Sequence, residues 1–261
     1  MDLQLTGKRA LVTGSNSGLG ESIAERLAAE GAEVVVHGRD HARAETVAAR
    51  IGGTVAVGDL ATDEGADAVA TAALAGGGID ILVNNAGAYE HLTWAEASPD
   101  HWRQTYEVNV VSGVRMIHRF VPAMRERGWG RVITIGGGLA TQPMAGLPHY
   151  NATLAARHNL AVSLARELRD TGVTSNVVAP GAILVPAVQE FLTGLAPDRG
   201  WGRTWAEVEH AAVRELVPND VGRFGRPEEI AGAVAYLTST LADYVSGAVL
   251  RVDGGTIRSV A

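Results

Sequence analysis

The chain has 261 residues, of which 46% are hydrophobic, so it can bury the core of one α/β domain or of two smaller ones. A formal net charge of −7 argues against a surface for nucleic acid or for an anionic membrane. Cysteine is absent, which excludes disulfides and thiolate metal sites, and the sequence shows neither a leader-like start nor an apolar run of membrane-spanning length. We therefore expect a cytoplasmic protein without membrane or nucleic-acid partners.

The first predicted strand, 8–12, leads into a glycine-rich loop and a helix. Residues 13–20 read TGSNSGLG, and apolar positions from Ile23 onward then follow helical spacing as far as Gly31. Such a loop lets backbone approach a ligand, and a helix N-terminus offers free N–H groups to phosphate. A second strand, 33–36, follows at the distance of a βαβ unit, so the pattern predicts a dinucleotide site. The residues assigned to it here are Gly14, Ser15, Asn16, Ser17, Gly18, Leu19 and Gly20.

The end of the second strand bears on the choice between NAD and NADP. An acidic side chain at this point would bind the adenosine ribose hydroxyls, but the position is Gly38. Arg39 follows it, and a guanidinium suits the 2′-phosphate of NADP. The sequence therefore predicts NADP(H) in preference to NAD(H). The alternative is that Arg39 is an exposed arginine at the start of a helix.

Two more strand–helix units follow, with strands at 54–57 and 79–83. The next helix opens with Ser98 as N-cap and Pro99 in the first position, and runs to about residue 120 with Asn109 in its middle. Since the strands are parallel, their carboxyl ends share one edge of the sheet, where such sheets bind ligands. The residues assigned to the cofactor site after these two strands are Asp59, Leu60, Asn85, Ala86 and Gly87.

The stretch 130–160 reads as a buried strand, a glycine-rich bend and a helix. The strand, 131–135, is apolar and β-branched, and three glycines at 136–138 end it. Helical spacing starts near His149, which places Tyr150 in the first turn of the helix. Its phenol is therefore expected at the same sheet edge as the glycine bend, where we expect the chemistry to be decided.

The remaining chain completes the alternation of strands and helices. Strands are predicted at 174–178 and 248–252 and a helix at 227–237, and Pro180, Gly181 and Ile183 are assigned to the cofactor site. The segment 183–218 is longer than a packed connection, so we interpret it as a lid of two helical pieces whose aromatics face a substrate cavity. The alternative is that these aromatics are core or oligomer contacts. The whole pattern predicts one domain, 1–261, with a doubly wound, mostly parallel sheet of Rossmann type.

Several of these motifs together resemble the short-chain dehydrogenase/reductase family over nearly the whole chain. They are TGSNSGLG at 13–20, Asp59-Leu60, NNAG at 84–87, Asn109, Tyr150, Pro180-Gly181 and RVDGG at 251–255. The resemblance implies a seven-stranded sheet, an NAD(P)(H) site that includes Tyr150, and a homotetramer or homodimer.

The resemblance also implies four catalytic residues, of which this chain keeps two. Asn109 and Tyr150 match, but the serine position is Gly137 and the lysine position is Leu154. An unperturbed tyrosine has a pKa of about 10, so only ~0.1% is phenolate at pH 7. Without the lysine, alcohol oxidation should suffer more than carbonyl reduction, which uses the neutral phenol as proton donor.

Other side chains are candidates to replace the missing groups. Lys8, the only lysine, begins the first strand and therefore lies at the opposite edge of the sheet, so it cannot replace the missing lysine. Arg157 lies near the helix face of Tyr150, about 10 Å further along the axis. His149 and His91 are candidate donors to a substrate oxygen, although a lone histidine is more often a packing or loop residue.

Three functions remain open from the sequence. The first is an NADP(H)-dependent oxidoreductase that reduces a carbonyl of an apolar or cyclic small molecule, and the complete set of cofactor motifs favours it. The second is a non-redox dehydratase, isomerase or cyclase that uses Tyr150, His149 or His91 as acid and base. The third is a catalytically silent NADP(H)-binding protein, because fold alone does not decide function.

Overall fold

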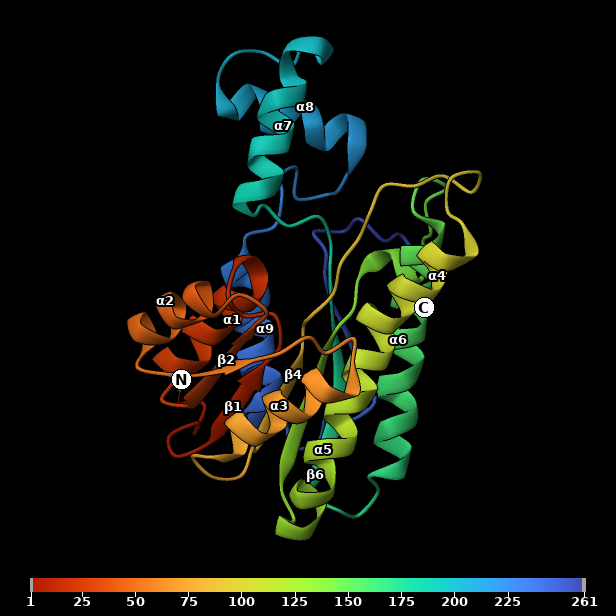
Figure 1. Cartoon of the computed structure of the whole chain (residues 1–261). Coiled ribbons are helices and arrows are strands. Elements are labelled where there is room, and N and C mark those ends of the chain that lie inside the picture. Colours follow the sequence, from red (N-terminus) through yellow and green to blue (C-terminus); the bar gives the residue numbers. More distant parts are fainter. Residues whose placement is uncertain (1, 260–261) are drawn as a thin grey trace.

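The computed structural model describes residues 2–259 and contains a seven-stranded sheet in the order β3-β2-β1-β4-β5-β6-β7 (Figure 1). Every pair of neighbouring strands is parallel. The strands are β1 (Arg9–Val12), β2 (Glu33–Gly38), β3 (Thr54–Val57), β4 (Ile81–Asn84), β5 (Gly130–Ile135), β6 (Val173–Pro180) and β7 (Val249–Val252). The predicted Rossmann-type fold is confirmed, and the order reverses at β1 and β4, where such sheets form their ligand crevice.

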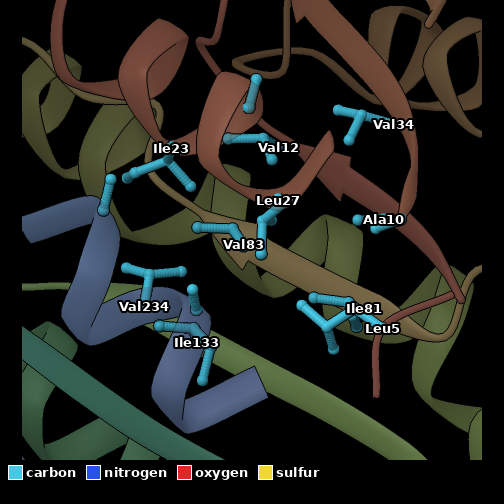
Figure 2. Packing of buried hydrophobic residues seen from close by; sticks show 14 of the residues in the cluster. Leu5, Ala10, Val12, Ile23, Leu27, Val34, Ile81, Val83, Ile133 and Val234 are labelled. Atoms are coloured by element: carbon cyan, nitrogen blue, oxygen red, sulfur yellow. The ribbon is translucent and has the colours of Figure 1, made fainter. Parts of the chain in front are cut away.

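Helices cover both faces of the sheet (Figure 1). One face carries α1 (Gly18–Ala29), α2 (His41–Ile51) and α9 (Pro227–Thr238), and the other carries α3 (Asp63–Leu74), α5 (Ser112–Arg127) and α6 (Pro148–Glu167). On the first face, Leu27 and Val234 pack over Val12 and Val83 (Figure 2). Each such side chain contributes about 1.5–3 kcal/mol through burial. Within residues 2–259 no helix combines the length and the apolar character needed to cross a membrane.

The predicted helix around Asn109 is longer than expected and changes its winding. It consists of α4 (Pro99–Tyr106), a π-helical turn (Glu107–Val111) and then α5. Ser98 caps it as predicted, since its side chain accepts a hydrogen bond from the backbone N–H of His101. The π turn inserts an extra residue at Asn109, and such turns often occur at functional sites.

The segment 183–218 forms two helices, α7 (Pro186–Arg199) and α8 (Trp205–Leu216), which follow the carboxyl end of β6 and project from the body of the molecule (Figure 1). Their aromatics are arranged differently from the expectation that they face a substrate cavity. Trp201 is buried in the cluster between the two helices and Trp205 packs against it, while Phe191 is exposed. Pro197 lies inside α7.

Candidate functional site

The glycine-rich loop between β1 and α1 has an inward and an outward side. Ser15 faces inward: its hydroxyl donates to the Val12 carbonyl (2.7 Å) and its N–H donates to the His37 carbonyl (2.8 Å). Both of its donors are thus used within the protein. At Ser17, the N-cap of α1, no side-chain capping bond forms, so the first N–H groups of the helix keep no side-chain partner. These N–H groups are the ones available to a phosphate.

The loop is joined to the segment after β4 through Thr13 and Asn85. The Thr13 hydroxyl accepts from the backbone N–H groups of Asn85 and Ala86, both at 2.9 Å. The Asn85 amide donates to the carbonyls of Thr13 (2.8 Å) and Gly14 (3.2 Å). A Cβ at Gly20 would lie 2.5 Å from the Asn85 amide nitrogen and would overlap the Gly14 carbonyl, so this close approach requires glycine. Thr13 belonged to the motif, but its pattern gave no signal of this role.

His37 in β2 supports the same loop and was not singled out from the sequence. It is 4% exposed, its Nδ1 accepts from the Gly14 N–H (2.8 Å), and its Nε2 lies 3.1 Å from the Gly58 carbonyl. These partners require the neutral tautomer with hydrogen on Nε2. The pKa of His37 is lowered, and the largest cause is its burial. The sequence signal for this role is a polar residue, His37, inside an otherwise apolar strand.

This arrangement predicts that acid weakens the fold through His37. Because its pKa is lower in the folded than in the unfolded chain, its contribution is complete above about pH 6.5 and is lost as pH falls below that value, by at most about 1.4 kcal/mol per pH unit. Urea unfolding between about pH 5 and 8 measures it, and H37Q should show a flatter dependence. H118Q, at an exposed position, should keep the wild-type slope. Equal slopes in H37Q and wild type would contradict the prediction.

The end of β2 leaves no room for an acidic side chain. A Cβ at Gly38 would lie 2.5 Å from the amide nitrogen of Asn16, so Asn16 fills the place that such a side chain would take. Arg39 comes next, is exposed, and forms no ion pair with residues 2–259. Asp40 then caps α2 by accepting from the Arg43 N–H (3.2 Å). The guanidinium of Arg39 is therefore available beside the loop.

Asn109 is buried and joins the loop after β4 to α6. Its Oδ1 accepts from the Ala88 N–H (2.8 Å), and its Nδ2 donates to the Ala88 carbonyl (2.9 Å) and to the Thr153 hydroxyl (3.1 Å). These bonds use the side-chain amide within the protein. Asn109 thus holds the backbone of the loop after β4 in place.

Tyr150 lies in the first turn of α6, as the sequence predicts, and is partly buried. Its phenol makes no hydrogen bond to residues 2–259, and its ring centroid lies 5.7 Å from that of Tyr89, which is 57% exposed. Burial raises the pKa of Tyr150, while the charge of Arg157 acts in the opposite direction. The phenol is consequently neutral at physiological pH and free to donate a proton.

Gly137 and Leu154, the positions of the absent serine and lysine, lie against each other. A Cβ at Gly137 would be 3.0 Å from the Leu154 Cδ1, and Leu154 is 2% exposed. Gly137 has a φ of 176°, which any residue adopts, so the backbone permits a serine here and only the room for its side chain is limiting. The Leu154 side chain would therefore have to move by a few tenths of an ångström to admit a serine Cβ.

The two candidate histidines and Lys8, which the sequence excludes as a helper, occupy three different environments. His149 is buried, its ring centroid lies 6.3 Å from that of Trp102, and its Nδ1 finds no hydrogen-bond partner among residues 2–259. Burial lowers its pKa. His91 is exposed, with its ring centroid 5.8 Å from that of Tyr89. Lys8 lies 3.7 Å above the ring of Trp129, next to the amino end of β1 and away from this site.

Arg157 is turned into the interior and contacts backbone. Its guanidinium donates to the carbonyls of Ile135 (2.8 Å), Ala86 and Asn109. Burial lowers its pKa to about 10, so it stays protonated at neutral pH. Its spacing from Tyr150 predicts its position on the helix face but not these partners.

The other residues assigned to the cofactor site lie at the carboxyl ends of β3 and β6. Asp59 accepts from the Ala61 N–H (3.0 Å), and Leu60 is buried. Pro180 ends β6, and the Gly181 N–H donates to the Val252 carbonyl (3.2 Å). Ile183 forms an isolated parallel bridge with Gly225. The structure thus brings the predicted cofactor residues to one sheet edge.

Comparison with known proteins gives consistent matches. The family profile described as short chain dehydrogenase matches residues 8–195. The uncharacterized oxidoreductase YvaG of Bacillus subtilis (strain 168) is 40% identical, with 100% of both chains covered. The D-beta-hydroxybutyrate dehydrogenase of Cupriavidus necator is 35% identical, over 97% of this chain and 99% of that protein. The crystal structure of L-sorbose reductase from Gluconobacter frateurii, complexed with NADPH and L-sorbose, has a TM-score of 0.91 and 36% identity, with 100% of both chains covered.

Proposed function

Since this chain belongs to the short-chain dehydrogenase/reductase family and is an oxidoreductase with a nicotinamide cofactor, we propose that it reduces the carbonyl of a small molecule with NADPH. The observation that carries the proposal is the state of Tyr150. Its phenol is neutral, has no hydrogen-bond partner within residues 2–259, and stands at the edge where the cofactor residues converge. A neutral phenol donates a proton but does not accept one.

The cofactor residues of this chain fit a dinucleotide. The close backbone approach at Gly20 and the free N–H groups at the start of α1 suit the pyrophosphate, and Arg39 suits a 2′-phosphate. When bound, the nicotinamide supplies the hydride. Tyr150 donates the proton to the carbonyl oxygen as the alcohol forms, and Asn109 holds the adjoining backbone.

The surroundings of Tyr150 support an apolar or cyclic substrate. Tyr89 and Trp94 in the loop after β4, and Met144 in the loop after β5, are large hydrophobic side chains left exposed. Exposed apolar surface of this kind at a ligand edge suits an apolar group.

The helices α7 and α8 act as a lid above the same edge of one domain, and the chain assembles as a homodimer or homotetramer.

The test is NADPH oxidation, followed by absorbance, against a panel of ketones, quinones and imines. Turnover with at least one carbonyl class supports the proposal. Because Gly137 and Leu154 stand at the positions of the family's catalytic serine and lysine, two other outcomes would each support a different function. Tight NADPH binding without turnover on any of the panel points to a silent binding protein. Conversion of a substrate without change in nicotinamide absorbance points to non-redox acid–base chemistry.

The cofactor preference can be tested at Arg39. R39S is expected to weaken NADPH binding at least about tenfold, because a charge-assisted hydrogen bond of 1.5–3 kcal/mol is removed, and to leave NADH binding nearly unchanged. Titration calorimetry with both cofactors measures the ratio. R43S is the matched control, since Arg43 is another exposed arginine one turn away and pairs with Asp40. A wild-type protein that prefers NADH would overturn the assignment.

A further inference from the structure

We propose that Arg157 is the positioning residue of this site: its buried guanidinium donates to three backbone segments beside Tyr150 and carries a positive charge near the phenol at neutral pH. The inference deepens the proposed reductase function and rests on it. Leu154, at the lysine position, lies one helical turn before Arg157 on the same face of α6. In this chain the cation near the phenol is thus Arg157 and not a lysine at position 154.

The three carbonyls that Arg157 binds come from three separate segments. Ala86 lies in the loop after β4, Asn109 lies in the π turn, and Ile135 is the last residue of β5. Each segment carries part of the site, because Gly137 follows Ile135 by two residues and Asn109 itself holds the loop after β4. A single side chain therefore sets the relative position of these segments beside Tyr150.

Gly87 shows how closely the loop is built around this arginine. A Cβ at Gly87 would lie 2.9 Å from the Arg157 Nη2 and 3.3 Å from the Asn109 Oδ1. A side chain at position 87 would displace one of these two groups. The glycine, the asparagine and the arginine consequently form one packed unit beneath the site.

The charge of Arg157 has no acidic partner within residues 2–259. Its ligands are carbonyl dipoles, and the titratable group whose charge interacts with it is Tyr150. Burying an unpaired charge is costly, so a guanidinium kept there calls for a reason beyond packing. A guanidinium also retains its proton at neutral pH, so Arg157 orients and polarises but does not relay protons. Tyr150 must then receive its proton from the solvent-facing side, where Tyr89 lies.

The test compares R157M and R157K with R9M. Arg9 is a matched control because it is also 8% exposed and its guanidinium also donates to two carbonyls, of Ala73 and Gly77, at the opposite edge of the sheet. The readouts are the Kd for NADPH and the titration of Tyr150, followed as the ultraviolet difference between each protein and its Y150F counterpart. Neither readout needs a carbonyl substrate.

R157M is expected to raise the midpoint of the Tyr150 titration, because the charge of Arg157 lowers the pKa of the phenol, and to weaken NADPH binding about tenfold. R157K should keep the midpoint near that of wild type but lose part of the affinity, since an ammonium cannot span three carbonyls. R9M should lose stability with neither change. If R157M does not fold, R157Q supplies the neutral variant, and the same midpoint shift is expected.

The proposal is overturned if the neutral variant leaves the Tyr150 midpoint unchanged, or if R9M weakens NADPH binding as much as R157M does. Either result would make Arg157 a support of the fold alone. A protein that shows the expected shifts but oxidises no NADPH with any carbonyl would instead contradict the reductase assignment. The two failures are therefore separable.

Discussion

The double variant G137S/L154K is expected to reduce carbonyl substrates about 10²-fold faster than wild type in kcat/KM. A serine at position 137 would add a hydrogen-bond donor to the reacting oxygen, and one such donor is worth roughly 10²–10³ in rate. The backbone already permits it, because Gly137 is extended with a φ of 176°. Steady-state NADPH oxidation by wild type, both single variants and the double variant measures the effect.

The single variants should not add up to the double. G137S alone brings its Cβ to 3.0 Å from the Leu154 Cδ1, and such overpacking costs about 1–3 kcal/mol of stability and displaces the hydroxyl. L154K alone adds a second cation near Arg157 without a donor for the substrate, so little gain is expected. The lysine's unbranched chain relieves the crowding in the double variant, so the two changes are coupled.

The matched control for this experiment is G138S. A Cβ at Gly138 would lie 2.9 Å from the Ile257 Cδ1, so the crowding is similar while the hydroxyl stands one residue away. Its rate should not rise. If the double variant gains no more than G138S, the pocket is not built for serine-assisted reduction, and the non-redox and silent-binding functions gain weight.

The fold could be predicted because strand and helix patterns are local. The bounds of β3 agree with the predicted 54–57, and the first turn of α6 contains Tyr150 as expected. The π turn at Asn109 could not be predicted, because an extra residue in one turn leaves the apolar spacing on either side nearly unchanged. The choice between a cavity-facing and a core role for the aromatics of 183–218 stayed open for a related reason: periodicity shows that a side chain is buried but not which element covers it, and the structure places Trp201 in the core.

The site was predicted only as far as its parts were contiguous in sequence. The glycine loop, Asn109 and Tyr150 lie in recognisable motifs, whereas the roles of Thr13 and Arg157 depend on partners about 70 residues away. From its spacing, about 10 Å beyond Tyr150 along the α6 axis, Arg157 was one candidate to replace the missing groups. Its contacts are with carbonyls beneath the site, which spacing along one helix does not reveal.

Y150F is expected to lower kcat for carbonyl reduction by 10²–10⁴, the range for loss of a positioned general acid. Stability should change by less than about 0.5 kcal/mol, since the phenol makes no hydrogen bond to residues 2–259. Y89F is the matched control, because Tyr89 is the neighbouring exposed phenol, and its kcat should stay within about threefold of wild type. Full activity in Y150F would transfer the donor role to His91 or His149.

The same tyrosine predicts that the two directions of the reaction respond oppositely to pH. Burial raises the pKa of Tyr150, so the neutral donor persists through the physiological range and is lost only as pH rises through that raised value. Reduction should therefore stay constant to at least about pH 9, while alcohol oxidation, which needs the phenolate, should be slow at pH 7 and increase with pH. Rates in both directions from about pH 6 to 10 measure this. Oxidation that is already maximal at pH 7 would mean that another group holds Tyr150 ionised, and the assignment as a dedicated proton donor would fail.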